Sequence, residues 1–139
     1  MRPILDEVVE AYPNDVIVYF KHFPLSSHAD SLPAARAAIA ASRQGKFNEM
    51  HTMLLENQEQ QSIRDILLYA DRIGLDMARF QIDFNAKDVV AQAEGDKQEG
   101  IAAGVEGTPT IYLNGREYTD PLGFPFLKDW IDEHLAVNR

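Results

Sequence analysis

The hydrophobic pattern of this chain changes its period twice, and this order restricts the fold more than any other feature. Residues 16–20 (Val-Ile-Val-Tyr-Phe) form a short β-branched and aromatic run without polar alternation, which is typical of a strand buried on both faces. Helical spacing then dominates as far as residue 103. Alternation returns over residues 110–119, around the hairpin dipeptide Asn114-Gly115. The order predicts an α/β layer interrupted by a run of helices, not a bundle or a sandwich.

The helical segments can be bounded by their caps and breakers. Ser62 and Asp65 form a capping-box pattern with Asp in place of Glu, and Gly45, Gly74 and Gly104 stand where helices should stop. The predicted helices cover residues 3–12, 32–44, 47–56, 63–73, 77–84, 88–103 and a final stretch that starts at Pro125. Five of them therefore lie between the first strand and the hairpin.

Length and charge limit the classes of partner. The chain has 139 residues, 45% of them hydrophobic and 25% charged, which suits one globular domain. Its formal net charge of −9 makes nucleic acids and anionic membrane surfaces poor partners. No apolar run reaches the ~18 residues of a membrane span, and the N-terminus lacks the profile of a signal peptide. As written, the chain is expected to stay in the cytoplasm.

Several kinds of chemistry are excluded by residue type. The sequence contains no cysteine, so it cannot form disulfides, thiolate metal sites or thiol nucleophiles. His22, His28, His51 and His134 are scattered without the spacing of metal ligands, which predicts no metal site and structural or surface roles for each. No nucleophile motif and no phosphate-binding glycine loop is present, and no cofactor is expected.

A group of short motifs resembles a known family when the motifs are taken in order. The matching pieces are Pro3-Ile4-Leu5, Tyr19-Phe20-Lys21-His22-Phe23-Pro24-Leu25, Leu32-Pro33-Ala34-Ala35, Gly45-Lys46-Phe47, and Gly107-Thr108-Pro109-Thr110 followed by the Asn-Gly hairpin. Each is weak alone, but together they resemble the DsbA-like thiol-disulfide oxidoreductases of the thioredoxin superfamily. The resemblance implies one thioredoxin-like domain, made of residues 1–25 and 104–139, with a helical insertion at about residues 26–103.

The resemblance also implies a binding site. In this family a loop with a cis proline lies opposite a CxxC motif at the start of the first helix. The cis-proline loop here would be Gly107, Thr108 and Pro109, with substrate proteins or peptides as partners. Thr108 would present its backbone to an extended substrate segment, which would pair with it like an added strand. Pro109, in the cis form, would hold the shape of the loop.

The chain departs from the family at the CxxC motif. By resemblance, the motif and the first strand should come just before Met1, and both are missing. We therefore expect a member of an oxidoreductase family that is redox-inactive as given. Two explanations stay open: the start of the chain is placed too late or was shortened, or a genuine relative has lost its active site. A shortened chain could belong to the periplasm or cell envelope.

The missing strand has a structural consequence. By resemblance, it would lie between the equivalents of residues 16–20 and 110–113. Two bare strand edges invite association, so we expect a homodimer, a swapped assembly or a collapsed sheet in which the two strands pair directly.

Two other readings remain. One is a redox-silent thioredoxin-like module that binds proteins or peptides. The other is a relative of the glutathione-dependent isomerases and kappa-type transferases, which share the helical insertion and which this sequence does not exclude. The segment of residues 21–25 resembles the oxidoreductases better.

Overall fold

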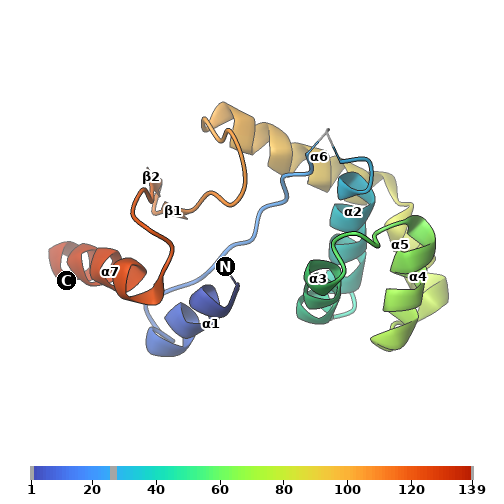
Figure 1. The fold of residues 1–139 in the computed structure, drawn as a ribbon, viewed down its shortest axis with the longest axis horizontal. Helices are drawn as coiled ribbons and strands as arrows, with labels where there is room; N and C mark the ends of the chain where they lie inside the picture. The colour runs from blue at the N-terminus through green and yellow to red at the C-terminus, as the bar shows by residue number, and fades with distance from the viewer. Residues whose placement is uncertain (1, 26–27, 139) are drawn as a thin grey trace. The chain divides into compact units, whose positions relative to one another are not determined.

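The computed structural model describes residues 2–25 and 28–138. The chain divides into two compact units, each built around its own core (Figure 1). Met1–Phe20 with Val105–Arg139 forms the terminal unit, and Lys21–Gly104 forms the helical unit. Residues 21–25 thus belong to the helical unit.

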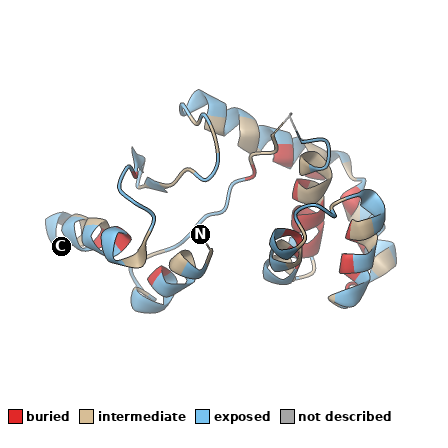
Figure 2. Ribbon diagram, in the orientation of Figure 1, coloured by how far each residue is buried: buried red, intermediate tan, exposed pale blue. Residues whose placement is uncertain are grey.

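The helical unit is organised around one alanine-rich helix. Its elements are α2 (Ser31–Ser42), α3 (Phe47–Glu56), α4 (Ile63–Arg72), α5 (Met77–Phe84) and α6 (Lys87–Ala102). Helix α2 contacts each of the other four. Ala37, Ala40 and Ala41 are fully buried, and such small side chains let neighbouring helices approach closely. Met50, Ile66 and Phe80 fill the core between the helices, where buried positions follow the inner helix faces (Figure 2).

Local signals set the helix ends here. The predicted bounds of α3 and α5 are confirmed to the residue, and α4 differs by one position. The capping box is present: the Ser62 N–H donates to Asp65 Oδ2 at 3.3 Å, and the Asp65 N–H donates to Ser62 Oγ at 3.2 Å. Gly74 has a φ of 81°, the left-handed conformation that ends a helix at little cost for glycine.

The terminal unit joins both ends of the chain. It contains α1 (Arg2–Ala11), β1 (Tyr112–Leu113), β2 (Arg116–Glu117) and α7 (Phe124–Asn138). The hairpin pairs Tyr112 with Glu117 and Leu113 with Arg116 in antiparallel register. Its core consists of four buried side chains, Val8, Tyr118, Leu127 and Ile131.

The predicted hairpin turn is confirmed. Asn114 and Gly115 have φ values of 47° and 85°, as a two-residue turn with two positive φ angles requires. The Tyr118 N–H donates to the Ile111 carbonyl at 2.8 Å, which extends the pairing one step beyond the assigned strands. The strands themselves are shorter than the alternation over residues 110–119 predicts.

The prediction of a buried strand over residues 16–20 is wrong. This segment has no assigned secondary structure, and Ile17 and Tyr19 are 76% and 79% exposed. The physical reason is the lack of a neighbour: over residues 2–25 and 28–138, the sheet contains only β1 and β2. The direct pairing of a collapsed sheet is therefore not formed by the described residues. The incomplete sheet that the resemblance implies is what the structure contains.

Candidate functional site

The cis-proline loop leads into β1. The peptide bond between Thr108 and Pro109 is cis, and both residues are exposed. Gly107 and Thr110 are half-buried, and the Thr110 hydroxyl donates to the Gly107 carbonyl at 2.7 Å. This side-chain bond closes the loop on itself. The three residues predicted to bind substrate thus lie on an exposed loop with an internal brace.

Thr108 has an unpaired backbone. Its N–H and C=O form no hydrogen bond with any residue that the structure describes. Backbone polar groups need a partner, so these two groups are left to water or to a bound chain. An exposed backbone of this kind, three residues before the sheet begins to pair at Ile111, is suited to strand addition.

The hairpin that follows the loop is fixed on α7. The Trp130 indole N–H donates to Asp120 Oδ2 at 2.5 Å, and the ring of Tyr118 meets Trp130 edge-on, with centroids 5.1 Å apart. The Arg116 guanidinium lies 4.5 Å from the centroid of the Trp130 ring, within the range of a cation–π interaction. Asn114 Nδ2 and His134 Nε2 are 2.8 Å apart. The loop therefore continues into a hairpin that is attached to α7 by these side chains.

A second surface of the terminal unit is apolar. The open segment, residues 17–20, exposes four large side chains: Ile17, Val18, Tyr19 and Phe20. The backbones of Ile17, Val18 and Tyr19 form no hydrogen bonds with described residues. Val16, just before them, packs in the same cluster as Ile111. The open segment thus leaves the core of the unit and has strand-like composition without strand pairing.

The charged groups of the terminal unit stabilise its helices. The Tyr12 hydroxyl donates to Asp132, whose other oxygen pairs with Lys128 at 2.5 Å. Loss of hydration and the Asp132 carboxylate raise the pKa of Tyr12, and the bond to Asp132 raises the pKa of Lys128. Both groups therefore keep their protons at neutral pH. The bond of Tyr12, the residue after α1, reaches α7, whereas the Lys128–Asp132 pair lies within α7.

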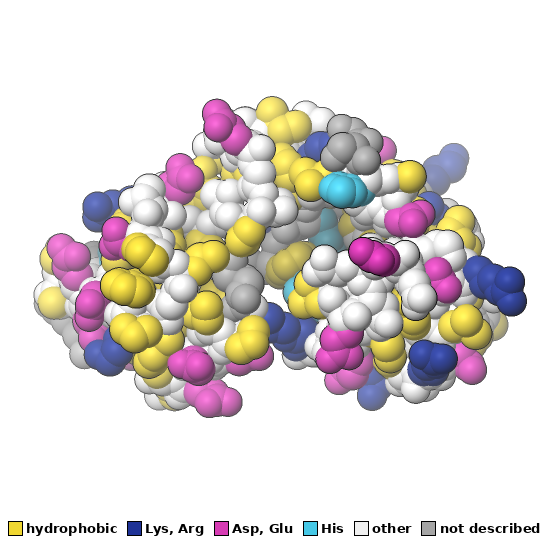
Figure 3. Space-filling view, in the orientation of Figure 1, with side chains coloured by type: hydrophobic (Ala, Val, Ile, Leu, Met, Phe, Trp, Pro, Cys, Tyr) yellow, Lys and Arg dark blue, Asp and Glu magenta, His cyan; other side chains and the backbone are white. Residues whose placement is uncertain are grey.

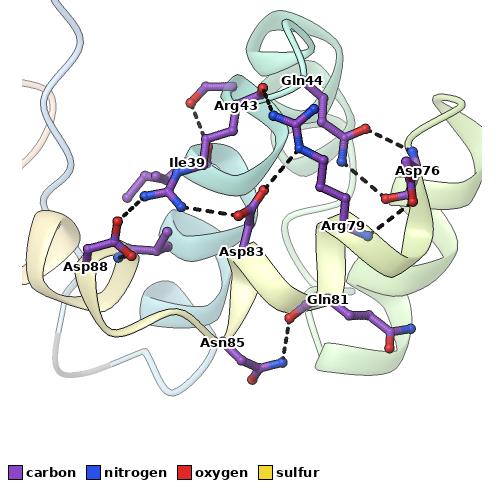
Figure 4. Close-up of polar contacts among 11 residues, drawn as sticks. Ile39, Arg43, Gln44, Asp76, Arg79, Gln81, Asp83, Asn85 and Asp88 are labelled. Atoms are coloured by element: carbon purple, nitrogen blue, oxygen red, sulfur yellow. Dashed lines mark hydrogen bonds and ion pairs between the residues drawn. The ribbon is translucent and has the colours of Figure 1, made fainter.

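The largest charge network of the helical unit is also structural (Figure 4). Arg43, just after α2, pairs with Asp88 at 2.6 Å and with Asp83 at 3.2 Å, and Arg79 lies 3.8 Å from Asp83. The bond to Arg43 lowers the pKa of Asp88. In the part of the chain that the structure describes, no group of three or more potential metal ligands occurs. The network joins α2, α5 and α6.

The comparisons with known proteins identify the family. The sequence matches the family described as Thioredoxin over residues 2–133. The chain belongs to the thioredoxin family.

Two solved structures have the same fold as this thioredoxin-family chain. A thioredoxin-like oxidoreductase from Silicibacter pomeroyi DSS-3 superposes with a TM-score of 0.84 at 27% identity, covering 97% of this chain and 77% of that one. The oxidoreductase DsbA from Xylella fastidiosa gives a TM-score of 0.68 at 22% identity, covering 94% and 78%. The DsbA-like thioredoxin fold with a helical insertion is thereby shown.

Curated relatives of the thioredoxin-family chain are transporters by name. The Na(+)/H(+) antiporter NhaA 1 of Mycobacterium sp. (strain KMS) is 35% identical over 120 residues, which make up 84% of this chain and 20% of that protein. NhaA 3 of Salinispora tropica is 35% identical over 139 residues, covering 99% and 21%. The chain spans about a fifth of the length of these relatives. None of the helices described for it is long and apolar enough to cross a membrane.

One residue of this thioredoxin-family chain has a setting that the sequence does not predict. His22 is 7% exposed, the buried polar side chain of the described core. Among residues 2–25 and 28–138, the other histidines belong to no group of potential metal ligands: His28 lies in a loop, His51 on α3 and His134 on α7. The signal that could have found His22 is its place in the apolar segment of residues 21–25, between Phe20 and Phe23.

Proposed function

We propose that this thioredoxin-family chain binds extended polypeptide segments at Gly107, Thr108 and Pro109, and that it performs no thiol–disulfide exchange by itself. The family is one of oxidoreductases, and the structural neighbours carry that name. In thiol–disulfide exchange, this chain could bind the substrate polypeptide, but it has no thiols of its own.

The observation that carries the proposal is the unpaired, exposed backbone of Thr108. A bound segment in the extended conformation would pair with that N–H and C=O and continue the ladder that Ile111 and Tyr118 begin. Backbone pairing is indifferent to the sequence of the bound segment, which suits a protein with many substrates. The formal net charge of −9 favours segments that carry Lys or Arg.

The lack of redox activity follows from the chemistry of exchange. A thiolate must attack a disulfide sulfur and form a mixed disulfide before the bond can pass on. No side chain of this sequence can become that thiolate. We expect the rate of insulin reduction by dithiothreitol to equal the rate without protein. A rate above that background, with contaminating oxidoreductases removed, would contradict the proposal.

Peptide binding is tested by a titration with a defined probe. The probe is a peptide of about seven residues with alternating Val and Thr and a Lys at each end, long enough to form a strand. Amide signals of Gly107 and Thr108 in a labelled sample should shift on addition. A matched peptide with N-methyl groups on alternate nitrogens cannot pair as a strand and should leave these signals in place. Equal shifts with both peptides would contradict strand pairing.

A second proposal concerns assembly, and the open segment favours it. Exposed apolar segments of extended chain are sites of association. A second copy could cover Ile17, Val18 and Tyr19, whose backbones form no hydrogen bonds with described residues, by antiparallel pairing. We propose a homodimer through this segment. Light scattering after size exclusion should give twice the mass of one chain. The variant Tyr19→Lys should give the mass of a single chain.

The matched control for assembly is Val137→Lys. Val137 is as exposed as Tyr19, at 79%, and lies on α7 of the same unit. This variant should remain dimeric. A monomer in the unaltered chain, or equal loss of the dimer in both variants, would overturn the assembly proposal without touching the peptide site.

A further inference from the structure

The unpaired backbone before the cis proline extends beyond one residue. Glu106 and Thr108 are both exposed, and neither backbone forms a hydrogen bond with residues 2–25 or 28–138. In a paired strand, alternate residues exchange hydrogen bonds with the same neighbour. A polypeptide that pairs with Thr108 can therefore continue along the chain toward Glu106.

Glu106 places a negative charge beside the cis-proline loop. It is the only charged side chain within residues 105–115, and its carboxylate has no partner among the residues that the structure describes. Two residues span at most about 7 Å, which limits the distance between the Cα atoms of Glu106 and Thr108. Salt at physiological strength screens charges over about 8 Å. A cationic side chain on a segment bound at Thr108 would therefore come within range of this carboxylate.

The charged side chains that follow the loop are placed differently. The Arg116 guanidinium lies on the ring of Trp130, and Asp120 accepts the hydrogen bond of the same indole. Glu117 belongs to β2 rather than to the loop. Glu106 is thus the charged group that a segment bound at the loop would meet first.

We infer that Glu106 selects the segment that this chain binds, and that it favours an extended polypeptide with Arg or Lys at the position facing Glu106. The inference rests on the peptide site proposed at Gly107, Thr108 and Pro109. Arg should be preferred to Lys, because a guanidinium can engage both oxygens of a carboxylate. The net charge of the chain attracts any basic segment, whereas Glu106 fixes where in the segment the basic residue lies.

The expected preference is modest, because both charges are exposed. Opposite charges that face each other on paired strands contribute little, as do surface ion pairs in general. A segment with Arg facing Glu106 should bind about two- to fivefold more tightly than the same segment with Gln. Added salt should reduce this ratio. Such a preference biases a site toward basic segments without excluding others.

Three peptides that differ at one position test the inference. Each has about seven residues of alternating Val and Thr with blocked, uncharged ends, and Arg, Gln or Glu at the centre. The dissociation constants come from the shift of the Thr108 amide signal in a labelled sample. The Arg peptide should bind more tightly than the Gln peptide, and the Glu peptide should bind most weakly.

Variants of the chain assign the preference to one side chain. Glu106→Gln should abolish the difference between the Arg and Gln peptides, and Glu106→Lys should make the Glu peptide bind more tightly than the Arg peptide. The control Glu133→Gln removes the same charge from an exposed position on α7 and should keep the preference. A preference that survives in Glu106→Gln, or that falls equally in Glu133→Gln, would overturn the inference, since net charge would then be the cause.

The same titrations separate this inference from the peptide site on which it rests. If all three peptides shift the Thr108 signal with equal affinity, the site stands and the role of Glu106 is wrong. If no peptide shifts that signal, the proposed site is wrong and the role of Glu106 is wrong with it.

Discussion

The helical unit and the terminal unit bury their apolar residues to different extents. In the helical unit, large side chains such as Met50, Ile66 and Phe80 are fully enclosed. The terminal unit buries four core side chains and exposes Ile17, Tyr19 and Val137 almost completely. Hydrophobic side chains, yellow in Figure 3, are accordingly numerous on the surface of the terminal unit. Helices that are neighbours in sequence can close a core among themselves, whereas an extended segment needs a strand from elsewhere.

The largest effect is expected from emptying the closed core. Phe80→Ala removes a fully buried ring between helices and should lower the free energy of unfolding by about 3–5 kcal/mol. Urea denaturation followed by circular dichroism measures the change. Ile82→Ala is the control, since Ile82 is on the same helix and is 73% exposed. A similar small change in both variants would break the contrast between a closed and an open unit.

A smaller effect is expected from the equivalent change in the terminal unit. Leu127→Ala should cost about 2–3 kcal/mol, because the cavity would lie in a small cluster that can relax toward the uncovered side. The same denaturation experiment applies, with Val137→Ala as the exposed control on α7. A loss larger than that of Phe80→Ala would show that the terminal unit is the better packed of the two.

The same difference explains what the sequence could predict. The bounds of α3 and α5 follow from signals within a few residues of the helix ends, and both were predicted correctly. The strand over residues 16–20 was not, because strand burial depends on a partner that periodicity cannot reveal. For the candidate site, Thr108 could be named from a local motif and its resemblance. The burial of His22 was not predicted, although the residue lies in an apolar segment, and its backbone bond to Asp96, 74 positions away in the chain, has no local signal.

The N-cap at Ser62 should contribute measurably to the stability of the helical unit. Ser62→Ala removes the side-chain acceptor for the Asp65 N–H at the start of α4 and should cost about 1 kcal/mol. Thr52→Ala, on the exposed side of α3, should leave stability unchanged or slightly raised, because alanine favours helices. No loss in Ser62→Ala would mean that α4 is fixed by its packing alone.

The smallest effect is expected from the charge network at the end of α2. Arg43→Gln removes the ion pairs to Asp83 and Asp88 that join α2 to α5 and α6. Both pairs are reached by solvent, so the loss should be smaller than that of the cap and should shrink as salt is added. Arg64→Gln, an exposed arginine on α4, is the control and should show neither effect. A loss of stability in Arg43→Gln that salt does not reduce would show that the aliphatic part of Arg43 packs on the helices. Close packing would then stabilise even the polar edge of the helical unit.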